Sequence, residues 1–126
     1  MTIRQAITTL DSSCRNTVEE PVKRAWLSKL DGQLHQDVVL THVHETAQAE
    51  FCGYDAQTDC DTVLLIPAPY DAEVYPLYLQ MLLDRENGEG EKYNQSAALY
   101  NQALLAFFDW YNRKHLPLHG GRRFVF

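Results

Sequence analysis

The fold of this chain is decided by residues 91–114, which read EKYNQSAALYNQALLAFFDWYNRK. Steps of three and four residues separate a series of apolar side chains in this stretch: Tyr93, Ala97, Tyr100, Leu104, Phe107 and Tyr111. This spacing predicts a long α-helix with one buried face. The stripe is widened by Leu105, Phe108 and Trp110, so we expect the helix to contact partners on more than one side.

Two shorter helices are predicted near the start of the chain. Both open with a Thr followed three residues later by Gln or Glu, at residues 2–5 and 17–20, which is the pattern of a capping box. The first predicted helix runs over about residues 3–12. The second continues to about residue 40, with Pro21 in its first turn, where a missing N–H costs least.

A third helix is predicted before the long one. Asp71 is a suitable N-cap residue, and Asn87-Gly88 is a common helix ending. Pro76 would interrupt the hydrogen bonds of a helix interior, so regular helix is expected from about Glu73 or Tyr75. The short connection that follows should place the third and fourth helices side by side and antiparallel.

The rest of the chain lacks helical periodicity. Residues 41–62 predict a long irregular, exposed loop that could include a short β-hairpin, and residues 63–66 a buried extended segment. The expected fold is therefore mostly α, a small four-helix bundle with this loop between its second and third helices. Residues 1–117 form the single helical domain. Residues 118–126 form an extended tail, flexible or docked on a partner.

Composition limits the classes of function. The chain has 126 residues and a formal charge of −6, which disfavours a surface built to grip nucleic-acid backbones. No apolar run is long enough to span a bilayer, and the first residues do not resemble a secretion signal, so no membrane association is expected. Three scattered cysteines at 14, 52 and 60 suit a reducing compartment.

Histidines and cysteines in or near the loop region are candidates for metal binding or thiol chemistry. His42 and His44, with His35 nearby, could ligate a metal, but no accompanying CxxC or HExxH pattern supports this. We expect surface histidines and no metal. Neither Cys52 nor Cys60 is expected to lie beside a cation or a helix N-terminus, so neither is predicted to be a reactive thiolate.

Acidic residues are candidates for calcium binding, and aromatic residues are candidates for binding nucleic-acid bases. Asp55, Asp59 and Asp61 lack the glycine and closing glutamate of a calcium loop, so a solvated turn is expected. The tyrosines could form a stacking platform for bases, but their positions match helix stripes and predict core instead. They are Tyr70, Tyr75, Tyr78, Tyr93, Tyr100 and Tyr111. No catalytic motif is present, so we expect no enzyme and no cofactor.

Several short stretches, in order, resemble a family of phage structural proteins. They are RAWLSKLDG (24–32), LLIPAPYD (64–71), YPLYL (75–79), NGE (87–89), YNQSAALYN (93–101) and WYNR (110–113). On these stretches the chain resembles the head–tail connector, or adaptor and head-completion, proteins of siphophages and prophages. The match covers about residues 3–40 and 62–117, while the loop and the tail depart from the pattern.

The resemblance implies a structural virion protein. Such proteins form a ring of about twelve copies beneath the portal protein, extend the DNA channel and bind the next neck or tail component. DNA passes through without specific binding. The implied location is the virion neck, with assembly in the bacterial host cytoplasm. The alternative is a small metal-binding or regulatory helical protein of a mobile element that uses the loop with His42 and His44.

Two further expectations concern the core and the interface. One set of side chains should be buried and mutually close: Trp26, Leu30, Leu77, Met81, Tyr100, Leu104 and Phe107. The interface candidate is the end of the tail, where two cations and two aromatic rings follow a Gly-Gly pair: Arg122, Arg123, Phe124, Val125 and Phe126. Arginine and aromatic residues commonly anchor protein interfaces.

Overall fold

The computed structural model describes residues 1–41 and 51–114, and within these ranges it is mostly helical. Its elements are α1 (Ile3–Ser13), α2 (Glu20–Asp37), the 3₁₀ helix η1 (Val39–Thr41), α3 (Asp71–Glu86) and α4 (Gly90–Lys114). The described residues form no strand beyond an isolated bridge between Thr2 and Val63. The predicted mostly α fold with four helices is confirmed.

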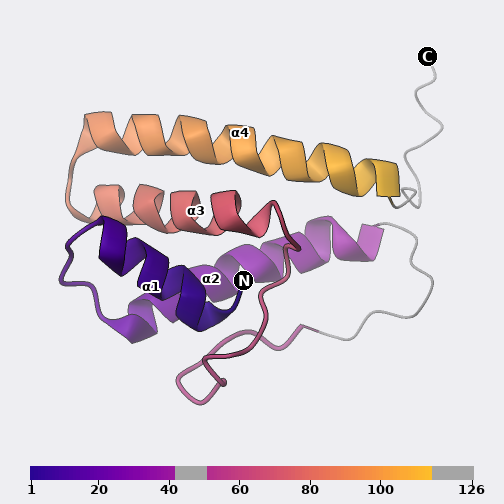
Figure 1. The fold of residues 1–126 in the computed structure, drawn as a ribbon, viewed down its shortest axis with the longest axis horizontal. Helices are drawn as coiled ribbons and strands as arrows, with labels where there is room; N and C mark the ends of the chain where they lie inside the picture. Colours follow the sequence, from indigo (N-terminus) through magenta and orange to yellow (C-terminus); the bar gives the residue numbers. More distant parts are fainter. Residues whose placement is uncertain (42–50, 115–126) are drawn as a thin grey trace.

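The helices are arranged in layers (Figure 1). α3 lies in the middle, with α4 along one side of it and α1 and α2 on the other. Among the described helices, α4 approaches only α3, and α3 approaches α1, α2 and α4. The expectation that α4 contacts partners on more than one side is therefore not met within the described chain.

Local sequence explains most helix ends. The capping box at Thr2 and Gln5 is present, and Gly88 adopts the left-handed conformation (φ 70°) after α3. The second predicted box is wrong, because the N-cap of α2 is Glu19, with no side-chain cap bond, and Thr17 lies outside the helix. α2 also ends at Asp37, since the chain tightens into η1 before Leu40.

The start of α3 differs from the prediction. The N-cap is Tyr70, Asp71 is the first helical residue, and Pro76 lies inside the helix. Proline at position 76 leaves the carbonyl of Ala72 without its intrahelical donor. Ala72 is exposed, so water can bond this carbonyl, and the helix tolerates the proline.

The buried core only partly matches the expected set. Leu30, Tyr100 and Phe107 are buried, but Trp26, Leu77, Met81 and Leu104 are only partly buried. The buried face of α4 keeps Tyr100, Phe107 and Tyr111 of the predicted stripe and adds Ser96 and Ala103, while the other predicted positions are only partly buried. Because α4 does not approach α2, Trp26 and Leu30 lie in a different layer from Tyr100 and Phe107. The core therefore has two layers that meet at α3.

The connection between α2 and α3 is irregular, as predicted, but its described part is held against the helices. The described residues 51–62 form turns and no hairpin. In the next segment, residues 63–66, Val63 forms the isolated bridge and the chain bends at Leu65 and Ile66; Leu64 and Ile66 are buried and Val63 is exposed. Carbonyls of this connection also receive bonds from the first turn of α1: Ile3 N–H donates to Thr62 O (3.1 Å) and Arg4 N–H to Cys60 O (2.9 Å).

Candidate functional site

One buried cation fixes the described part of the loop to α2. The Arg24 side chain is almost fully buried. Its Nη1 donates to the carbonyls of Asp55 and Thr58, both at 2.7 Å, and its Nη2 lies 2.6 Å from Cys60 Sγ. Nε donates to Glu20 on the same helix. The guanidinium is thus used to hold one turn of the loop, and this explains why a charged side chain is buried there.

That turn is closed by its own acidic residues. Asp55 Oδ1 accepts from the backbone N–H groups of Gln57 (2.9 Å) and Thr58 (3.0 Å), and these bonds lower the pKa of the carboxyl. Asp59 accepts in the same way from the N–H of Asp61. Asp55 and Asp59 therefore serve as acceptors within turns, while the Asp61 carboxylate accepts from Arg4 Nε of α1 at 3.1 Å.

A second buried anchor lies about two turns further along α2. Asp31 has no exposed surface. Its Oδ2 accepts from Tyr54 O–H (2.5 Å) and from Leu65 N–H (3.0 Å), and its Oδ1 accepts from Tyr75 O–H (2.7 Å). The Tyr75 oxygen in turn accepts from Ile66 N–H at 2.8 Å. One carboxylate therefore joins α2, the loop, the segment 63–66 and α3.

Burial dominates the electrostatics of this network. It raises the pKa of Asp31 above its ordinary value, although hydrogen bonds from Tyr54, Tyr75 and Leu65 oppose the shift. Burial and the nearby carboxylate raise the pKa of Tyr54 and of Tyr75. Both phenols therefore stay protonated near neutral pH, and each can donate its O–H to Asp31.

The cysteine expectation is wrong for Cys60. Its sulfur lies beside the Arg24 guanidinium, which comes from a distant helix that spacing along the chain did not connect with it. Cys52 is exposed, and Cys14 lies at the end of α1. No group of three or more potential metal-ligating residues occurs within 1–41 and 51–114.

Of the three histidines that could ligate a metal, only His35 lies within the described residues. His35 is buried on α2, with its ring 6.0 Å from that of Phe51, which packs edge-on against Tyr54 at 5.3 Å. His42 and His44 lie outside the described residues, so their role in metal binding remains a prediction. The same holds for the interface residues of the tail: Arg122, Arg123, Phe124, Val125 and Phe126.

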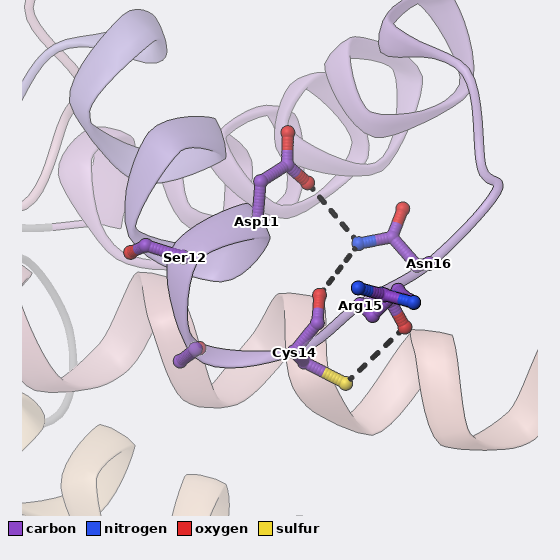
Figure 2. Close-up of a pocket in the computed structure, with 6 residues that line it drawn as sticks. Asp11, Ser12, Cys14, Arg15 and Asn16 are labelled. Atoms are coloured by element: carbon purple, nitrogen blue, oxygen red, sulfur yellow. Dashed lines mark hydrogen bonds between the residues drawn. The ribbon is translucent and has the colours of Figure 1, made fainter.

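A shallow hollow lies at the turn between α1 and α2 (Figure 2). It measures about 370 Å³ and is lined by residues 11–16. Asn16 donates to Asp11 Oδ1 (3.1 Å) and to the carbonyl of Cys14 (3.0 Å), while Lys23 donates to the same carboxylate. The Lys23 bond lowers the pKa of Asp11. These polar groups bond to one another, so the hollow is explained as the surface of a turn.

The tyrosines and neighbouring rings build the seam between α3 and α4. Tyr78 packs on Tyr100 at a ring distance of 5.3 Å, and Phe107 contacts Tyr70, Trp110 and Tyr111. Tyr75, Tyr78, Tyr100 and Tyr111 are buried, which confirms core over a base-stacking platform for these four. Burial raises the pKa of Tyr100 to about 12.

Sequence reasoning missed the most distinctive surface, the outer face of α4. We define this face as the exposed residues between Lys92 and Asp109: Asn94, Gln95, Ala98, Leu99, Asn101, Gln102, Leu105 and Ala106. Leu99 and Leu105 are 52% and 60% exposed. No charged residue occurs between Lys92 and Asp109, and that gap was the available signal.

Searches against family models, curated proteins and solved structures give no match to this chain. Within the described ranges, every helix is too short or too polar to span a lipid bilayer.

Proposed function

We propose that this protein is a head–tail connector of a tailed phage or prophage, a structural protein that works by assembly and not by catalysis. The observation that carries the proposal is the ordered series of stretches that resemble this family. They extend from residues 24–32 on α2, through the connection at 64–71, to α3 and α4.

The resembling stretches supply much of the packed body. Leu27 and Asp31 come from the first of them, Ile66 from the second and Tyr75 from the third, and all four are fully buried or nearly so. Asp31, Ile66 and Tyr75 also meet in one hydrogen-bonded network. This supports reading the resemblance as one of fold, with the partner-contacting parts free to differ.

In this proposal the helical body is a rigid subunit of a ring of about twelve copies beneath the portal. The formal charge of −6 would keep the channel wall from holding DNA as it passes. The tail end, residues 122–126, would reach a neighbouring subunit or the portal, with Arg122 and Phe124 among its anchors. The other end of the ring would present a surface to the next neck component.

Binding to purified portal complexes tests the proposal. The full chain should co-sediment with portal rings, and a variant with alanine at Arg122, Arg123, Phe124 and Phe126 should lose at least about tenfold in affinity. A variant with alanine at Lys92 and Glu91, exposed at the start of α4, is the matched control and should bind normally. The proposal would be overturned if the full chain failed to bind the portal complex of the phage that encodes it.

A zinc titration distinguishes the metal-binding alternative from the proposed connector function. Zinc should not bind the full chain more tightly than a variant with alanine at His42 and His44. Tight binding of one zinc ion by the full chain, lost in that variant, would instead favour the alternative.

A further inference from the structure

The turn between α3 and α4 contains an asparagine that is followed directly by a glycine. Asn87 is the only asparagine of the chain in this position, since the others precede Thr17, Gln95, Gln102 and Arg113. Glycine has no side chain to shield its backbone nitrogen. The side-chain amide of Asn87 is therefore the one most open to attack by the nitrogen of the next residue.

The surroundings of the pair leave it open to reaction. Asn87 and Gly88 are both exposed, at the end of the molecule where α3 passes into α4 (Figure 1). A Cβ built at Gly88 would meet no atom within 4 Å. Within residues 1–41 and 51–114, no hydrogen bond holds the side-chain amide of Asn87. Packing therefore does not protect this amide.

The backbone of the turn does restrain it. Asn87 has ψ −3°, so the Gly88 nitrogen is nearly eclipsed with the Asn87 nitrogen and points away from the Asn87 side chain. The Gly88 N–H donates to Arg85 O (3.2 Å), and the Glu89 N–H donates to Asp84 O (3.0 Å). Bringing the Gly88 nitrogen to Asn87 Cγ requires rotation about the Asn87 Cα–C bond, which breaks the bond to Arg85. The closed turn therefore opposes the attack.

We propose that Asn87 is a site of spontaneous deamidation and that opening of the turn after α3 sets its rate. In the open turn the Gly88 nitrogen attacks Asn87 Cγ and a new C–N bond closes a cyclic imide. The side-chain nitrogen leaves as ammonia, with the proton of the Gly88 N–H. Water then opens the imide at either carbonyl, which leaves aspartate or isoaspartate at position 87. Water is the only other reactant, and no oxidant or reductant takes part.

The product should weaken the turn. A new carboxylate would lie at the C-terminal end of α3, where the helix dipole disfavours negative charge, and beside Glu86 and Glu89. Isoaspartate also adds a methylene to the backbone, so the bonds from Gly88 and Glu89 back to α3 could not both keep their geometry. The inference does not depend on the proposed function, because it concerns the covalent chemistry of the isolated chain.

Peptide mass spectrometry of the full chain, aged in mildly alkaline buffer, tests the proposal. In urea, conversion should be faster at Asn87 than at Asn94 and Asn101, which serve as controls in the same molecule. In the folded wild type, conversion at Asn87 should be at least about tenfold slower than in urea, because the closed turn is the main population. A rate at Asn87 in urea no higher than at the two controls would overturn the proposal.

Two variants test whether local opening sets the rate. Ser96→Ala removes the hydroxyl that donates to Asp84 Oδ2 at 2.7 Å, next to the turn, and should raise the folded-state rate about threefold without changing the rate in urea. Gly53→Ala is the matched control, because it strains the loop at a site away from the turn and should leave the rate at the wild-type value. Equal rates in the folded and unfolded wild type, or equal effects of the two variants, would overturn the role of the turn.

A product mimic tests the consequence. Asn87→Asp carries the charge of one product, and hydrogen exchange of its Glu89 amide should be at least about threefold faster than in the wild type. Circular dichroism should show wild-type helicity for all three variants. Unchanged exchange at Glu89 in Asn87→Asp would contradict the predicted loosening.

Discussion

The contact between α3 and α4 and the contact between α2 and the loop are built from different interactions. α3 and α4 meet mainly through apolar and aromatic side chains, such as Tyr78 on Tyr100, with one buried hydrogen bond from Ser96 Oγ to Asp84 Oδ2 at 2.7 Å. The loop meets α2 chiefly through two buried ionisable side chains, Arg24 and Asp31. The first contact is spread over many weak dispersion interactions, whereas the second depends on a few directional bonds.

The difference shows how each contact should fail. Shortening one ring in the α3–α4 seam leaves a cavity but spares its neighbours. Removing one anchor under the loop leaves several of its hydrogen-bond partners unsatisfied at once, acceptors in the case of Arg24 and donors in the case of Asp31. The two contacts should therefore respond differently to substitution, to pH and to changes in backbone freedom.

The largest effect is expected in the seam. Phe107→Ala should lower the free energy of unfolding by about 3–5 kcal/mol, because Phe107 is buried among Tyr70, Trp110 and Tyr111. Urea denaturation followed by circular dichroism measures this. Leu105→Ala, on the exposed side of the same helix, should change stability by less than about 0.5 kcal/mol. Similar losses in the two variants would mean that α4 packs by another face.

Removing the carboxylate anchor should cost somewhat less. Asp31→Ala leaves the hydroxyls of Tyr54 and Tyr75 and the N–H of Leu65 without their acceptor. The expected loss is about 2–4 kcal/mol, since relief of the buried charge offsets part of it. Hydrogen exchange should show faster exchange at Leu65 and Ile66 before the α3–α4 amides are affected. Uniform acceleration across all helices would contradict separate contacts.

The same anchor should give the loop contact a pH dependence. Burial raises the folded-state pKa of Asp31, so its contribution to stability is complete below its ordinary pKa of about 3.9 and is lost as pH rises through the raised value. Asp31→Asn has no such titration. The stability of the wild type relative to this variant should therefore fall as pH rises from about 4. A difference that stays constant with pH would show that Asp31 titrates normally.

Two glycines near the loop give the smallest and opposite effects. Gly53 has φ 85°, and a Cβ there would lie 3.0 Å from Ser28 Oγ, so Gly53→Ala should cost about 1–2 kcal/mol. Gly32, inside α2, would place a Cβ 3.5 Å from Phe51, which is an ordinary contact. Gly32→Ala should therefore gain up to about 1 kcal/mol from helix propensity. Thermal unfolding of both variants measures the pair, and a loss in Gly32→Ala would indicate that Phe51 cannot adjust.

The sequence predicted the seam better than the loop contact, for a physical reason. Apolar periodicity placed Tyr100 and Phe107 in the core, although Ser96 and Ala103 were missed because small or polar residues weaken the pattern. Arg24 and Asp31 carry no such signal, because a charge on a helix is usually solvated. Apart from Glu20, their partners lie 23 or more residues away, and only the folded chain brings them together.

The two candidate surfaces, the outer face of α4 and the tail, also differ in what the sequence could predict about them. The lack of charged residues in this part of α4 could have predicted its outer face. Instead, Leu105, Phe108 and Trp110 were all assigned to one widened apolar stripe that contacts partners. The structure separates them, since Trp110 packs on Tyr70 while Leu105 faces outward. The tail residues 122–126 lie outside the described chain, so that prediction stands as it was made.

The backbone bonds that join α1 to the end of the loop also bear on the order in which the chain folds. α3 and α4 are connected by residues 87–89 alone, so their contact closes a short segment at little entropic cost. The bonds from Ile3 to Thr62 and from Arg4 to Cys60 close almost half the chain. Contacts between residues distant in sequence form slowly. We expect the α3–α4 hairpin to be part of the folding transition state and the first turn of α1 to be completed after it.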